Sequence, residues 1–229
     1  MEQREIVYNK TVETLGLSFP SVVAVVGCGG KTSLIKRLAS GYPGKRVLIS
    51  PTTKMFPVCV EGADCRGNLS PETGKLEALP PEELAVLIPR YDIALLEADG
   101  SNSLPCKGWR ENEPVVPHYS THTVGVLTMS ALGKAATASC VHNLPLFLAL
   151  TGLIEGQPIT ISALREMVCA PGGMFKNSVG SRVLLVNQVE DREGAAVARE
   201  FLLAVRESYP GYFAKLVLGS VHHDSWREV

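Results

Sequence analysis

Short runs of apolar and β-branched residues recur along the chain and alternate with segments of helical periodicity or with long polar loops. Six such runs are expected to be strands, at residues 21–26, 46–50, 92–97, 123–129, 182–187 and 215–219. Helices are expected at residues 31–40, 81–89, 142–153, 162–168 and 192–209. Strands that are apolar throughout are typical of parallel sheets covered on both faces. The alternation predicts an α/β fold, with a doubly wound, mostly parallel sheet and helices on both faces.

Two segments interrupt this alternation of strands and helices. Residues 55–80 are rich in Gly, Pro and small polar residues, and residues 101–120 are rich in proline. Long segments of this composition are expected to be functional or mobile loops. A chain of 229 residues fits one large α/β domain. We therefore expect a single domain over residues 1–229, with loop insertions near 55–80 and 101–120.

Composition and charge narrow the class of protein further. The 22 basic residues nearly balance the 23 acidic ones, so bulk charge favours neither a nucleic-acid nor a membrane partner. The start of the chain lacks an apolar core, and no apolar run reaches the roughly 18 residues that span a bilayer. We therefore expect a cytoplasmic protein. The six cysteines form no CxxC pair and are expected to be reduced thiols.

A glycine-rich turn follows the first expected strand in residues 21–38, "SVVAVVGCGGKTSLIKRL". The strand is expected to end at Val26, so that backbone N–H groups of the turn and the helix N-terminus can cradle phosphates. Lys31 could reach the β- and γ-phosphates, and the Thr32 hydroxyl could bind Mg²⁺. Val25 stands where the usual pattern has its first Gly, and the alternative is a plain glycine turn with an exposed lysine. We favour a shortened phosphate loop formed by Gly27, Cys28, Gly29, Gly30, Lys31, Thr32 and Ser33.

Two acidic residues follow the third expected strand in "DIALLEADGS". Mg²⁺ prefers hard oxygen ligands, and a phosphate-loop protein places an acid at the end of a second buried strand. Glu97 and Asp99 are both candidates to hold the metal with Thr32, and the sequence does not rank them. The same two acids and Lys31 are the candidate catalytic residues.

Two further segments follow expected strands and should lie at the same edge of the sheet, where ligands bind in such folds. Thr52, Thr53 and Lys54 could contact the metal, the γ-phosphate or an attacking water, although an ordinary turn is an equal alternative. Asn187 begins "NQVED" and could hydrogen-bond a purine, with Glu190 or Asp191 as the acid of a guanine-reading motif. Gln replaces the lysine of that motif, so ATP and GTP both stay open.

Taken together, these segments resemble the YqeC-type family of selenium-dependent hydroxylase accessory proteins. That family's pattern has a GxGGKT loop, a TTTK segment, an EADGS segment followed by EP..P, and a late NK.D. The corresponding segments here are "GCGGKTSLI", "SPTTKMFP", "LLEADGSNSLPCKGWRENEPVVP", "VGVLTMSALGK", "PGGMFK" and "LLVNQVED". Departures from the pattern are Asn102 or Ser103 in place of a basic residue, and Gln188 in place of lysine.

The resemblance implies a P-loop NTPase-like fold and a role in maturing selenium-dependent molybdenum hydroxylases. The ligands expected from the residues themselves are a nucleotide, ATP or GTP, and Mg²⁺. The partners implied by the resemblance are a molybdenum hydroxylase or its maturation factors, and a homodimer could supply a missing arginine. From the residues themselves, NTP hydrolysis is the first hypothesis. The alternatives are a small-molecule kinase that uses residues 104–118 to bind an acceptor, and a non-catalytic nucleotide-dependent adaptor.

Overall fold

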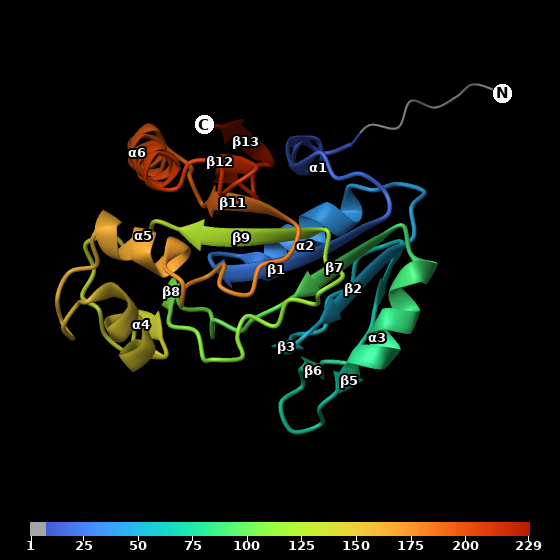
Figure 1. The fold of residues 1–229 in the computed structure, drawn as a ribbon. Coiled ribbons are helices and arrows are strands. Elements are labelled where there is room, and N and C mark those ends of the chain that lie inside the picture. The colour runs from blue at the N-terminus through green and yellow to red at the C-terminus, as the bar shows by residue number, and fades with distance from the viewer. Residues whose placement is uncertain (1–7) are drawn as a thin grey trace.

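An eight-stranded sheet forms the centre of the computed structural model, which describes residues 8–229 (Figure 1). The strand order is β13-β12-β11-β9-β1-β7-β2-β4, and all neighbours are parallel except the β12–β13 pair. The strands of this sheet are β1 (Ser21–Cys28), β2 (Val47–Pro51), β4 (Ala63–Cys65), β7 (Ile93–Glu97), β9 (His122–Thr128), β11 (Ser181–Asn187), β12 (Lys215–Ser220) and β13 (Ser225–Glu228). The expected mostly parallel sheet is confirmed.

Helices cover both faces of the sheet, as the sequence predicts. They are α1 (Lys10–Leu15), α2 (Lys31–Ser40), α3 (Pro81–Leu87), α4 (Leu144–Thr151), α5 (Ile161–Cys169) and α6 (Arg192–Ser208), with a 3₁₀ turn η1 (Ile88–Arg90). Buried side chains of α1 and α2 pack with Val23 and Val25 of β1. The alternate residues Ala24 and Val26 face the opposite layer, which contains α4, α5 and α6. Helix α3 packs on that same face beside β2 and β7, at the other end of the sheet from α6 (Figure 1).

The segment 55–80, expected to be a loop, contains short strands. Here β4 adds an edge to the main sheet, and β3 (Lys54–Met55), β5 (Asn68–Leu69) and β6 (Leu76–Glu77) form a small antiparallel sheet. The segment 101–120 holds only β8 (Cys106–Lys107), which pairs with β10 (Val141–His142). Strands of two or three residues carry no readable hydrophobic period, so the sequence pattern could not reveal them.

The first described helix and the last strand lie side by side although they are far apart in the sequence (Figure 1). The carboxylate of Asp224 accepts hydrogen bonds from the backbone and the hydroxyl of Thr11. The indole of Trp226 in β13 donates a hydrogen bond to the same hydroxyl. These hydrogen bonds hold α1 against β13, which pairs with β12 at the edge of the sheet. Within residues 8–229, no helix has both the length and the apolar content required to cross a bilayer.

Candidate functional site

The turn between β1 and α2 is tighter than the sequence suggests. Strand β1 does not end at Val26 but continues through Gly27 and Cys28, which pair with Val126 and Leu127 of β9. Only two glycines remain between the strand and Lys31, the first residue of α2. The expectation that Gly27 belongs to the turn is therefore wrong, because β9 extends far enough to pair with it.

Glycine is required at Gly29 because the turn passes close to β9. Its φ is 141°, and a Cβ there would lie 2.7 Å from backbone atoms of Leu127 and Thr128. Gly30, with φ 105°, is the N-cap of α2 and leaves that end of the helix without a capping side chain. The helix N-terminus therefore opens toward solvent with its partial positive charge available to an anion.

Lys31 lies in the turn with its ammonium group held by the protein. Its Nζ donates a 2.7 Å hydrogen bond to the carbonyl of Gly27 and lies 3.3 Å from Oδ1 of Asp99. The side chain is only 4% exposed. Burial alone would lower the pKa of Lys31, but the charges of Asp99 and Glu97 outweigh it and raise the pKa. The lysine is therefore charged and next to the turn, as phosphate binding requires.

Asp99 has no exposed surface, and protein donors occupy both of its carboxylate oxygens. The backbone N–H of Gly27 lies 3.1 Å from both oxygens. The indole N–H of Trp109 donates to Oδ2 at 2.6 Å, and Nζ of Lys107 lies 3.8 Å from the same atom. With these four neighbours, Asp99 holds the base of the turn and the ammonium of Lys31 in place.

Lys107 extends this buried cluster into the proline-rich segment. The side chain is fully buried, donates a 2.6 Å hydrogen bond to the carbonyl of Gly100, and lies 3.1 Å from Oε2 of Glu113. Two cations and two carboxylates thus meet beneath the turn. We call Lys31, Asp99, Lys107, Trp109 and Glu113 the buried cluster.

Glu97 lies two residues before Asp99 but has a different environment. Its Oε2 accepts a 2.8 Å hydrogen bond from the hydroxyl of Thr32, in the first turn of α2. Burial raises the pKa of Glu97, although the charge of Lys31 and the hydrogen bond from Thr32 act in the opposite direction. Both residues line a cavity at the N-terminal end of α2. Of the two acids that the sequence left unranked, Glu97 is the one that faces this cavity.

This end cavity has a volume of about 500 Å³ and brings four lysines to one space. Lys31 comes from α2, Lys54 from β3, Lys75 from the turn before β6, and Lys134 from the segment after β9. Its remaining walls are the glycine turn, Thr32, Ser33, Glu97, residues 100–105, Met55, Phe56, Thr128, Ser130 and Gln188. No spacing pattern marks Lys75 or Lys134 in the sequence, because both lie in irregular segments.

Residues Thr52 and Thr53 lie at the expected edge of the sheet but do not line the cavity. Thr52 donates a 2.6 Å hydrogen bond from its hydroxyl to the carbonyl of Val115, which fixes the proline-rich segment. The Thr53 hydroxyl is buried without a hydrogen-bond partner among the described residues. Lys54 does line the cavity and pairs with Glu77 at 2.7 Å.

Two other expected loop residues have clearly different surroundings. Cys28 is completely buried, and burial is the main reason that its thiol pKa is raised to about 12. The thiol is therefore neutral and does not line the end cavity. Ser33 is exposed on the first turn of α2 and lines the end cavity as well as a second one along the side of the helix.

Asn187, at the end of β11, joins three segments of the site. Its Nδ2 donates a 2.7 Å hydrogen bond to the carbonyl of Gly29, and its Oδ1 accepts one of 2.9 Å from the backbone of Val221. The side chain is almost completely buried. Both ends of its amide are engaged with the backbone, so Asn187 positions the turn.

The oxygen atoms at the end cavity suit Mg²⁺, which binds partly through phosphate and water. They do not form a site in which protein side chains alone coordinate a metal. Among residues 8–229, no group of three or more His, Cys, Asp and Glu side chains is placed to hold a metal ion. Mg²⁺ instead takes one or two protein oxygens and completes its shell with phosphate oxygens and water. The hydroxyl of Thr32 and the carboxylate of Glu97, hydrogen-bonded to each other, supply such oxygens.

The same residues carry the chain's similarity to known proteins. The profile of a family described as "YqeC protein" matches residues 23–145, which include the glycine turn, both acids and the buried cluster. The chain belongs to the YqeC family. A YqeC relative from Escherichia coli (strain K12), named an uncharacterized protein, is 32% identical over 214 residues, covering 82% of this chain and 84% of the relative. No solved structure matches the chain.

Proposed function

We propose that this YqeC family member binds a nucleoside triphosphate with Mg²⁺ in the end cavity, hydrolyses it, and thereby assists maturation of selenium-dependent molybdenum hydroxylases. The observation that carries the proposal is the meeting of the uncapped α2 N-terminus, the charged Lys31 and the Thr32–Glu97 pair in one lysine-lined cavity. Helix N-termini preceded by glycine turns bind phosphate through backbone N–H groups and the helix dipole. The maturation role is supported by the family resemblance alone.

Lys31 would exchange its contact with the Gly27 carbonyl for a phosphate oxygen. The lysine is already charged and its alkyl chain already ordered by burial, so little side-chain entropy is lost on binding. Asp99 would remain the counter-ion that keeps the ammonium at the turn. In this arrangement Asp99 is a positioning residue, which acts through Lys31 and the Gly27 N–H and does not touch the substrate.

Thr32 and Glu97 would hold the metal ion. When bound, Mg²⁺ neutralises charge on the phosphate oxygens and orients them. The Thr32 hydroxyl could then turn its lone pairs outward, while Glu97 offers its carboxylate from the end of β7. Lys75 and Lys134 face the same space and would stabilise charge that spreads over the γ-phosphoryl group during transfer.

Hydrolysis requires attack of water on the γ-phosphorus and cleavage of its bond to the bridging oxygen of the β-phosphate. The products are a nucleoside diphosphate and inorganic phosphate. Cations for the transition state come from this chain itself in the form of Lys75 and Lys134. An arginine from a second subunit in a homodimer could add a further cation to those of Lys75 and Lys134.

A small-molecule kinase is the second candidate, and one observation favours it. Residues 100–105 and the exposed ring of Phe56 form a wall of the end cavity away from the helix. An acceptor molecule could bind against this wall and take the place of the attacking water. Product analysis separates the two reactions, because a hydrolase releases free phosphate from nucleotide alone and a kinase requires an acceptor.

The proposal is tested by thermal unfolding with 2-fold dilutions of ATP or GTP in Mg²⁺. A ligand at about 100 times its Kd stabilises the native state by ~2.7 kcal/mol, which corresponds to a rise in Tm of several degrees for a chain of this size. We expect such a rise for the wild type and its loss in Lys31→Ala. The control is Lys10→Ala, which removes an exposed lysine from α1, far from the cavity. No rise with either nucleotide would contradict the proposal.

A further inference from the structure

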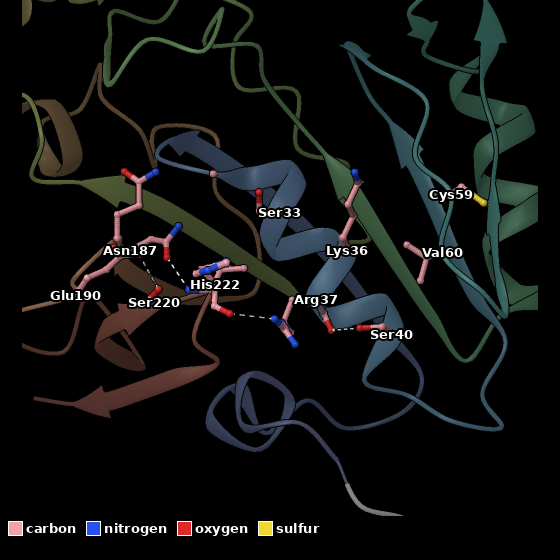
Figure 2. A pocket seen from close by; sticks show the side chains of 13 residues that line it. Ser33, Lys36, Arg37, Ser40, Cys59, Val60, Asn187, Glu190, Ser220 and His222 are labelled. Atoms are coloured by element: carbon pink, nitrogen blue, oxygen red, sulfur yellow. Dashed lines mark hydrogen bonds between the residues drawn. The ribbon is translucent and has the colours of Figure 1, made fainter.

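A second cavity of about 530 Å³ runs along the side of α2 and meets the end cavity at the helix N-terminus (Figure 2). Gly30, Ser33 and Gln188 line both cavities. One wall of this side cavity is the outer face of α2, with Lys36, Arg37 and Ser40. A second wall consists of the ends of β11 and β12, with Asn187, Gln188, Glu190, Ser220, Val221 and His222. Cys59 and Val60 line the cavity on the other side of α2 (Figure 2). A ligand whose phosphates occupy the end cavity can therefore extend directly into the side cavity.

The polar groups of the second wall are not equally free to contact a ligand. Both polar atoms of the Asn187 amide already bind backbone. Asp191 is the N-cap of α6, and its Oδ1 accepts a 2.7 Å hydrogen bond from the backbone of Gly194. Asp191 also does not line the cavity. Both side chains are therefore held in place by hydrogen bonds to the backbone, and Asp191 lies outside the lining of the cavity.

Glu190 is the carboxylate that the fold leaves at this wall. Its side chain is 53% exposed. The hydroxyl of Ser220 lies 3.4 Å from its Oε1, and Nε2 of His223 lies 3.8 Å from the same atom. These neighbours engage one oxygen of Glu190. Figure 2 shows Glu190 and Ser220 on the same side of the cavity, opposite Ser33 and Arg37 of α2.

An ionised carboxylate only accepts hydrogen bonds, so it discriminates between the two purine bases. Guanine presents two adjacent donors on its Watson–Crick edge, the N1–H and the N2 amino group. Adenine presents N1 as an acceptor at the matching position, which would face the carboxylate lone pairs. Gln188 cannot make this distinction, because its amide can rotate to offer either a donor or an acceptor.

We propose that the side cavity binds the base of the nucleotide and that Glu190 selects guanine, so that GTP is the substrate. The inference rests on the proposed nucleotide function. Asn187 contributes by holding the turn and the β12 end at a fixed separation across the cavity. The ribose and α-phosphate would pass from one cavity to the other beside Gly30, Ser33 and Gln188, which line both. Lys36 and Arg37 of α2 line the side cavity further along the helix, where Arg37 donates a 3.3 Å hydrogen bond to the carbonyl of His222.

The test is calorimetric titration of GTP, ITP and ATP with Mg²⁺ into the wild type, Glu190→Gln, Asp191→Asn and Lys31→Ala. ITP lacks the N2 amino group and isolates one of the two expected hydrogen bonds. A hydrogen bond to a charged group changes affinity by roughly tenfold or more. We expect the wild type to bind GTP at least about tenfold more tightly than ATP, with ITP between them. Glu190→Gln should lose most of this preference and leave the ATP affinity nearly unchanged.

Asp191→Asn is the matched control, because asparagine caps a helix as well as aspartate and the substitution removes a neighbouring charge. It should retain the GTP preference. Equal binding of ATP and GTP by the wild type, lost in Lys31→Ala, would overturn the guanine assignment and leave the nucleotide function standing. A GTP preference that persists in Glu190→Gln would also overturn it. If the wild type binds no nucleotide, or if Lys31→Ala binds nucleotide as tightly as the wild type, both the proposed function and this inference are overturned.

Discussion

The two acids at the end of β7 lie two residues apart, yet they belong to different regions of the molecule. Asp99 is at the centre of the buried cluster, where Gly27, Trp109 and two lysines surround its oxygens. Glu97 is only 7% exposed but lines the end cavity, where a threonine hydroxyl is its hydrogen-bond partner. One short acidic motif therefore supplies both a structural counter-ion, Asp99, and a carboxylate that lines a cavity, Glu97.

Breaking the buried cluster should reduce the free energy of unfolding more than a surface substitution or a change of pH does. Asp99→Ala would leave Lys31 and Lys107 as buried cations with fewer partners, together with the unpaired N–H groups of Gly27 and Trp109. Removing one partner of a buried ion pair costs about 3–5 kcal/mol. We expect a loss of that size in the free energy of unfolding, measured by urea denaturation.

Asp64→Ala is the surface control for this experiment. Asp64 also pairs with a basic residue, Arg66, and accepts a hydrogen bond from Tyr91, but all three groups lie at the surface. Exposed pairs of this kind contribute about 0–1 kcal/mol. Equal losses of stability in the two variants would show that the buried cluster has no special role.

Changing the pH should change the free energy of unfolding by a smaller amount. It tests the environment of Glu97 separately from that of Asp99. Burial raises the pKa of Glu97 above its ordinary value of 4.5, so the folded chain binds this proton more tightly than the unfolded chain does. The resulting stabilisation is complete below that ordinary value and is lost as the pH rises through the raised pKa. Without metal or nucleotide, wild type should gain stability relative to Glu97→Gln as the pH falls from 7.

Urea denaturation of both proteins at several pH values between 4 and 7 measures this difference directly. Glu97→Gln is the suitable reference because it keeps the shape of the side chain and removes the titration. A difference that stays constant, or that grows in the opposite direction, would mean that the Glu97 carboxyl is not desolvated in the folded protein.

Much of the fold could be read from the sequence because its central strands are long and buried on both faces. Strands β1, β7, β9, β11 and β12 appear within one or two residues of their expected positions. Helix α1 and strands β4 and β13 could not be found in this way. They are short, and α1 and β13 are held by contacts with each other across the whole chain, such as that of Thr11 with Asp224.

The candidate site was only partly accessible to sequence reasoning. Spacing predicted Lys31, Thr32 and the unranked acids Glu97 and Asp99, because a phosphate loop and an acidic strand end have fixed positions along the chain. The separation of Asp99 from Glu97 depends on Trp109 and Lys107, which fold back beneath the turn. Lys75 and Lys134 reach the cavity only through the tertiary fold, and a short segment pattern carries no signal for such an approach.

The most direct test of the account is the rate of phosphate release from GTP and ATP by wild type and Glu97→Gln, with and without Mg²⁺. The account predicts Mg²⁺-dependent release of free phosphate by wild type. In Glu97→Gln that rate should fall by roughly 100-fold. The metal would lose its anionic protein ligand in the end cavity, while the buried cluster stays intact. Release at the same rate in both proteins, or release that does not depend on Mg²⁺, would contradict the assignment of Glu97 to the metal.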